Sequence, residues 1–113
     1  MQNDNPFPHQ RLDAYQHAKE LARVVSAAKI AHAELRDQAE RAAISVFLNA
    51  SEGLPNDSVP MRRRYFTTAR NSLFELVAAV DLAATLGAMS VEDAAAAQAI
   101  AWRVRGMLVA LLR

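Results

Sequence analysis

Histidine and acidic side chains are the first candidates for chemistry in this sequence, because they bind metals and transfer protons. The three histidines, His9, His17 and His32, all lie in the first third of the chain. Asp13 and His17 stand one helical turn apart, a spacing that also suits an ordinary solvated helix face. A di-metal carboxylate site in a helical bundle needs Glu-x-x-His pairs on two helices, and the sequence contains no such pair. We therefore expect no metal and no cofactor.

Nucleophilic catalysis has no support in the sequence either. The chain contains no cysteine, which removes thiolate chemistry, disulfides and cysteine-bound metals together. Serines are plentiful, but the sequence gives none of them a histidine partner for activation. No strand is predicted, so a glycine-rich phosphate loop that follows a strand is excluded on architecture. These observations predict that the protein is not an enzyme.

Arg62, Arg63 and Arg64 precede Tyr65 and Phe66 and are the candidate nucleic-acid contacts, since arginine suits bidentate contact with phosphate. Consecutive side chains on a helix point about 100° apart, so an ordinary solvated helix start is the competing interpretation. The arginines lie in the first turns of a predicted helix, where they oppose the helix dipole by roughly 0.3 kcal/mol or more. The formal net charge is only +1, which gives no strong overall attraction to RNA or DNA.

A polar stripe runs along the predicted helix 33–52. Its members recur at spacings of three and four residues, and they are Gln38, Arg41, Ser45, Asn49 and Glu52. Two interpretations stay open: a solvated edge, or an inward network that pairs with Arg70, Ser72 and Glu75 of the next helix. Buried polar groups must satisfy one another or cost about 1–3 kcal/mol each. A buried network would therefore be structural and would fix which helix faces fit together.

The composition predicts that long helices position these side chains. Alanine occupies 24 of the 113 positions, against 3 glycines and 4 prolines, so almost every long stretch favours helix. With 52% hydrophobic and 22% charged residues, the chain has the length and composition of one folded domain. No apolar run approaches the roughly 20 residues that span a membrane, and the N-terminus lacks a signal-peptide pattern. We expect a cytoplasmic protein without a membrane segment.

In the first half of the chain, two prolines and a short interruption of the apolar pattern set the predicted boundaries. Residues 1–8 are polar and contain two prolines, which predicts a flexible lead before a single domain over 9–113. A first helix is predicted from His9, and a tight turn near His32 separates it from the second helix.

Capping residues define the other boundaries. Gly53 is predicted to end the second helix as a left-handed cap. Asp57 or Ser58 begins a third helix, which ends at Gly87, and Ser90 caps a fourth helix over 91–113. Four rods of about 30 Å joined by short turns predict an all-α, up-down four-helix bundle.

The helix over 91–113 carries more apolar surface than one core face needs. Trp102, Gly106 and Val109 lie together on a side that differs from its core face. This strip either packs against a neighbouring helix of the same bundle or forms an oligomer interface. The sequence favours self-association, because a core built from alanine buries little area and gains stability from subunit contacts. A membrane-surface helix is disfavoured because this helix has few basic residues.

Two blocks of the sequence carry a family resemblance. The first is Arg41-Ala42-Ala43, then Ser45, then Asn49-Ala50-Ser51-Glu52-Gly53, and the second is Ala69-Arg70-Asn71-Ser72-Leu73 with Glu75. Together with Leu12-Asp13-Ala14-Tyr15, these blocks resemble the 23S rRNA intervening-sequence proteins, or S23-type four-helix bundle proteins, over residues 9–112. The family often has proline where Phe47 stands and glycine where Asn71 stands, and both replacements favour a more regular helix.

The resemblance implies a left-handed four-helix bundle that assembles into a ring, commonly a pentamer, with no known catalytic residues. It also implies a motif network made of Arg41, Ser45, Asn49, Glu52, Arg70, Ser72 and Glu75. Relatives include the accessory protein of diversity-generating retroelements, which works with RNA and a reverse transcriptase. We therefore expect a homo-oligomeric scaffold or binding module. The alternative is an accessory protein that binds RNA, DNA or a nucleic-acid enzyme through Arg62, Arg63 and Arg64.

Overall fold

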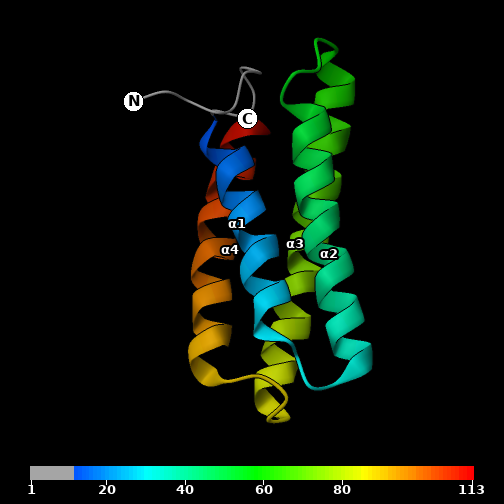
Figure 1. Cartoon of the computed structure of the whole chain (residues 1–113). Coiled ribbons are helices and arrows are strands. Elements are labelled where there is room, and N and C mark those ends of the chain that lie inside the picture. The colour runs from blue at the N-terminus through cyan, green and yellow to red at the C-terminus, as the bar shows by residue number, and fades with distance from the viewer. Residues whose placement is uncertain (1–11) are drawn as a thin grey trace.

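The computed structural model describes residues 12–113, and helices make up most of that range. The four helices are α1 (Asp13–Ala28), α2 (Ala33–Gly53), α3 (Val59–Thr85) and α4 (Val91–Leu111). Each helix runs antiparallel to the one before it, and contacts join α1 to α2, α2 to α3, α3 to α4 and α4 to α1 (Figure 1). The predicted all-α, up-down four-helix bundle is confirmed. The predicted lead over 1–8 and helix start at His9 lie outside the described residues.

The core between the four helices consists mainly of small side chains. Alanine accounts for 12 of the 23 buried hydrophobic residues in the described part of the chain. Larger side chains fill the centre, among them Leu21 of α1, Phe66 and Leu76 of α3 and Leu108 of α4, each 1% exposed or less. On α3 the buried side chains Phe66, Ala69, Leu73 and Leu76 recur at spacings of three and four residues, so this helix turns one face to the core.

The polar caps predicted for the third and fourth helices are confirmed. The Ser58 hydroxyl accepts a hydrogen bond at 3.4 Å, and the Ser90 hydroxyl accepts one at 3.0 Å, each from the amide three residues on. Gly87 follows α3 with φ +73°, the left-handed conformation that glycine adopts without strain. These signals act within a few residues, so the sequence alone locates them.

The prediction that Gly53 is a left-handed cap is wrong. Gly53 is the last residue of α2 and is buried, and Leu54 follows it with φ −59° and ψ −46°, a right-handed conformation. A Cβ atom at position 53 would lie 2.6 Å from Cε1 and 2.9 Å from Cδ1 of Phe66. Glycine is required here because the Phe66 ring packs directly against the backbone of α2.

The turn between α1 and α2 is built without glycine or proline. Lys29 ends α1 with φ 48° and ψ 60°, in the left-handed region. His32 caps α2, since its Nδ1 accepts a hydrogen bond from the Leu35 amide at 3.2 Å. The Ala31 amide donates to the Ala88 carbonyl at 2.8 Å, which ties this turn to the one between α3 and α4. The predicted turn near His32 is confirmed.

Replacing Lys29 with glycine is expected to raise the free energy of unfolding by about 1 kcal/mol. The left-handed conformation costs a residue with a Cβ atom about 1–2 kcal/mol, and the added flexibility of glycine in the unfolded chain offsets part of the gain. Urea unfolding at fixed protein concentration measures the change. Lys29→Ala keeps the Cβ atom and is the control, so equal stability of the two variants would contradict this explanation.

Candidate functional site

Three members of the predicted polar network meet between α2 and α3. Ser45 Oγ and Ser72 Oγ lie 2.7 Å apart. Asn49 Nδ2 donates to the Ser45 carbonyl at 2.9 Å and to Ser45 Oγ at 3.2 Å. Ser72 is buried, and Ser45 and Asn49 are half-buried. This part of the stripe therefore faces the neighbouring helix rather than open solvent, and we call Ser45, Asn49 and Ser72 the serine seam.

The other α2 members of the network and Glu75 lie beside the serine seam. A shallow pocket of about 250 Å³ is lined by Gln38, Arg41, Ala42, Ser45, Ser72 and Glu75. Arg41 bonds within its own helix, since its Nε donates to the Asp37 carbonyl at 3.3 Å and its Nη2 to Gln38 Oε1 at 3.5 Å. Glu52 is exposed near the end of α2. The hydroxyl and amide groups of the predicted network thus contact one another, whereas its charged residues Arg41, Glu52 and Glu75 lie outside the serine seam.

Arg70 is not brought to the serine seam. It precedes Ser72 by two residues on α3, which places the two side chains about 200° apart around the helix. Arg70 shares instead the helix side of Phe74 and Val77, which faces α4. Its Nε atom is buried and has no hydrogen-bond partner within the described structure. A buried donor of this kind costs free energy until an acceptor reaches it.

The three consecutive arginines separate in space. The Arg62 guanidinium lies 5.8 Å from the centroid of the Phe66 ring. Arg63 Nη1 donates to the Leu112 carbonyl at 2.7 Å and so links α3 to the end of α4. Arg64 is exposed and lines a separate surface pocket with Asn49. Three neighbours in the sequence therefore do not form one basic patch on a single chain.

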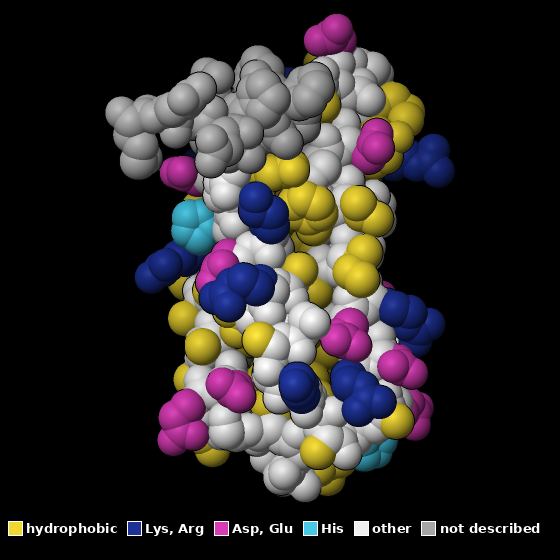
Figure 2. Space-filling model, viewed as in Figure 1, with side chains coloured by type: hydrophobic (Ala, Val, Ile, Leu, Met, Phe, Trp, Pro, Cys, Tyr) yellow, Lys and Arg dark blue, Asp and Glu magenta, His cyan; other side chains and the backbone are white. Residues whose placement is uncertain are grey.

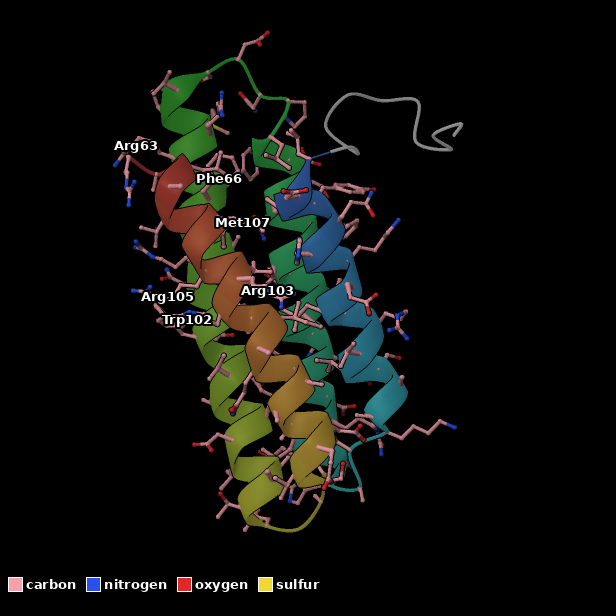
Figure 3. All side chains as sticks on the ribbon, turned by 90° about the vertical axis from the view of Figure 1, so that its left-hand side faces the viewer. Arg63, Phe66, Trp102, Arg103, Arg105 and Met107 are labelled. Carbon is pink, nitrogen blue, oxygen red and sulfur yellow. The ribbon has the colours of Figure 1, made fainter. Side chains whose placement is uncertain are left out.

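A largely apolar groove lies between α3 and α4. Its volume is about 460 Å³, and its lining residues are Leu73, Phe74, Val77, Asp81, Gln98, Ala101, Trp102 and Arg105. Trp102 is 70% exposed, and the Arg105 guanidinium lies 5.3 Å from the centroid of its ring. Both side chains project from α4 toward the α3 edge of the bundle (Figure 3). We call this feature the Trp102 groove.

The strip predicted on the fourth helix lies at the surface. Trp102 and Gly106 are exposed and Val109 is half-buried, so the bundle itself does not cover the strip. Phe74, which was not predicted as a site residue, lines the groove from α3 and is 52% exposed. The sequence could have indicated this role, because Phe74 and Val77 are three residues apart and therefore share one apolar side of the helix.

The described residues contain neither a candidate membrane span nor a cluster of metal-ligating side chains. Among the helices of residues 12–113, none combines the length and the hydropathy of a membrane span. Within the same range, no three histidine, aspartate or glutamate side chains come together as metal ligands would.

The fold and these surfaces define a class of protein: a small up-down four-helix bundle with polar contacts between α2 and α3 and an open apolar groove between α3 and α4. The family model described as 23S rRNA-intervening sequence protein matches residues 10–110 of this chain. The chain belongs to that family. A comparison with curated proteins finds no match.

Proposed function

We propose that this protein is a non-enzymatic, homo-oligomeric scaffold or binding module of the cytoplasm. One observation carries the proposal: the single chain exposes large apolar side chains on α2, at Ile44 and Leu48, and at the Trp102 groove, at Phe74 and Trp102. Monomeric proteins rarely leave large contiguous apolar patches uncovered, and an alanine core adds little burial to compensate. The pentamer is the ring size that the family resemblance implies.

Light scattering during size-exclusion chromatography at micromolar concentration tests this proposal. We expect the mass of several chains, and of five chains for the pentamer. A particle with the 12.4 kDa mass of one chain at every concentration would contradict it.

As the second candidate, we propose that the assembly binds RNA or DNA, or an enzyme that acts on them, through its arginines. Arg63 on α3 and Arg105 on α4 lie at the same edge of the bundle, and Arg103 projects from another side of α4 (Figure 3). Arg63, Arg64 and Arg103 are exposed. Cyclic symmetry would repeat each of these separate side chains in every subunit and so build a basic surface that one chain does not have. Phosphate neutralisation by such a surface makes affinity fall as salt rises.

Filter binding of a mixed-sequence single-stranded RNA across a salt series tests the second candidate. Replacing Arg62, Arg63 and Arg64 with alanine is expected to weaken binding and to reduce the salt slope by about 1 for each lost phosphate contact. Absence of binding at about 50 mM salt, or an unchanged slope in the triple variant, would rule the candidate out.

Arg23→Ala is the control for the salt series. Arg23 lies on α1, and its Nε donates to Glu20 Oε2 at 2.8 Å. This hydrogen bond lowers the pKa of the Glu20 carboxyl and raises the pKa of Arg23. Because the guanidinium is already engaged on its own helix, its removal is expected to leave the slope unchanged.

A further inference from the structure

The outer side of α2 carries apolar side chains that the bundle does not cover. Ile44 is 52% and Leu48 is 54% exposed, and the two lie one turn apart. Asp37, Glu40 and Arg41 occupy the same side of α2 in the preceding turns and line one surface hollow with Ile44. Figure 2 shows hydrophobic side chains over α2, with acidic and basic side chains mixed below them. We call Asp37, Glu40, Ile44 and Leu48 the α2 ridge.

The Trp102 groove is complementary to the α2 ridge in chemistry. Phe74 and Trp102 supply exposed apolar walls, and Arg105 supplies a cation at the rim. Arg70, on the same side of α3, holds a buried Nε donor that lacks an acceptor in the described structure. The acidic side chains of the α2 ridge therefore have one oppositely charged group to meet, Arg105, at an apolar groove that also holds one anion, Asp81.

The charged residues that line the Trp102 groove distinguish its two ends. Arg105 lies toward one end of the groove, and Asp81 and Gln98 line it toward the other end. The acidic end of the α2 ridge is attracted to Arg105 and repelled by Asp81, so only one orientation brings opposite charges together.

We propose that the α2 ridge of one copy of this chain docks into the Trp102 groove of a second copy. The inference rests on the proposed homo-oligomer and names the surfaces that join its subunits. Ridge and groove are different surfaces of the molecule, so the contact is heterologous, and each added copy presents one free ridge and one free groove. Contacts of this kind close into a ring when the rotation between copies permits.

A mixing experiment with two surface variants tests the pairing. The ridge variant carries Ile44→Asp and Leu48→Asp, and the groove variant carries Phe74→Asp and Trp102→Asp. Each is expected to run as a single chain, because each has lost one side of every contact. The mixture is expected to give a dimer of one copy each, since the intact ridge of one variant fits the intact groove of the other. Val91→Asp, at a residue 72% exposed and outside both surfaces, is expected to assemble as the unmodified chain does.

Each other result overturns the pairing. If the unmodified chain assembles and the ridge variant still does so, the pairing is wrong while the proposed function stands. If both variants are single chains and remain so when mixed, both surfaces are needed for assembly but do not bind each other, and the pairing is wrong. If the unmodified chain is itself a single chain, the proposed function fails and the pairing fails with it.

Cross-linking gives a second measurement that does not depend on disrupting the surfaces. The chain has no cysteine of its own. A Leu48→Cys chain mixed with a Phe74→Cys chain is expected to form a mixed cross-link with a short bis-maleimide. Cross-links only between like chains would overturn the pairing even where the aspartate variants fail to fold, which circular dichroism reveals.

Discussion

Replacing Gly53 with alanine is expected to lower the free energy of unfolding by about 2 kcal/mol, the middle of the range for overpacking a core. The new Cβ atom would lie 2.6 Å from Cε1 of Phe66, whose ring is fully buried. Alanine favours helix over glycine by about 1 kcal/mol, so the steric cost must exceed that gain. Urea unfolding at fixed protein concentration measures the net change.

Gly106→Ala is the matched control, because it is the same substitution within a helix. Position 106 of α4 is exposed, and a Cβ atom there meets nothing within 4 Å. This variant is expected to be more stable by about 0.5–1 kcal/mol, the helix propensity gain alone. In a Phe66→Leu background, Gly53→Ala should cost less. The same loss in both backgrounds would show that Phe66 is not the cause.

Replacing Ser45 with alanine is expected to lower the free energy of unfolding by about 1–2 kcal/mol, because it leaves a buried hydroxyl without its partner. That hydroxyl belongs to Ser72, which is 8% exposed and lies 2.7 Å from Ser45 Oγ. The double variant with Ser72→Ala removes both partners and is expected to cost less than the single substitution. Thermal unfolding of the four proteins in this cycle gives the coupling between the two residues.

Ser51→Ala is the control for the serine cycle. Ser51 also lies on α2 and is half-buried, but its Oγ donates to the Phe47 carbonyl of the same helix at 2.7 Å. Such a bond back to the preceding turn adds little to helix stability, so the loss is expected to be within about 0.5 kcal/mol. Additive costs of Ser45→Ala and Ser72→Ala would mean that the two hydroxyls do not depend on each other.

The sequence predicted those features that depend on near neighbours along the chain. The caps at Ser58 and Ser90 and the left-handed Gly87 each involve residues within one helical turn, so the residue types identify them. The apolar strip at Trp102 was located from its helical spacing, although its exposure depended on how closely α3 and α4 pack.

The features that the sequence did not predict depend on contacts between helices, on a backbone conformation that the residue type does not favour, or on the side of a helix that a residue occupies. From its residue type alone, Gly53 is expected to cap α2. The reason for glycine at this position is instead its contact with Phe66, which belongs to another helix. Lys29 adopts the left-handed conformation although nothing in its side chain favours it, since the turn into α2 must reach the Ala88 carbonyl. Arg70 stands two residues from Ser72 in its motif, yet the helix carries it to the side that faces α4.

The alanine-rich core has a thermal consequence. A buried alanine loses no rotamer entropy on folding, but it also removes less apolar surface from water than leucine does. The heat capacity change of unfolding rises with the apolar area that becomes exposed. With alanine at 12 of its 23 buried hydrophobic positions, this subunit is expected to have a shallow stability curve, whose height changes little between cold and warm conditions.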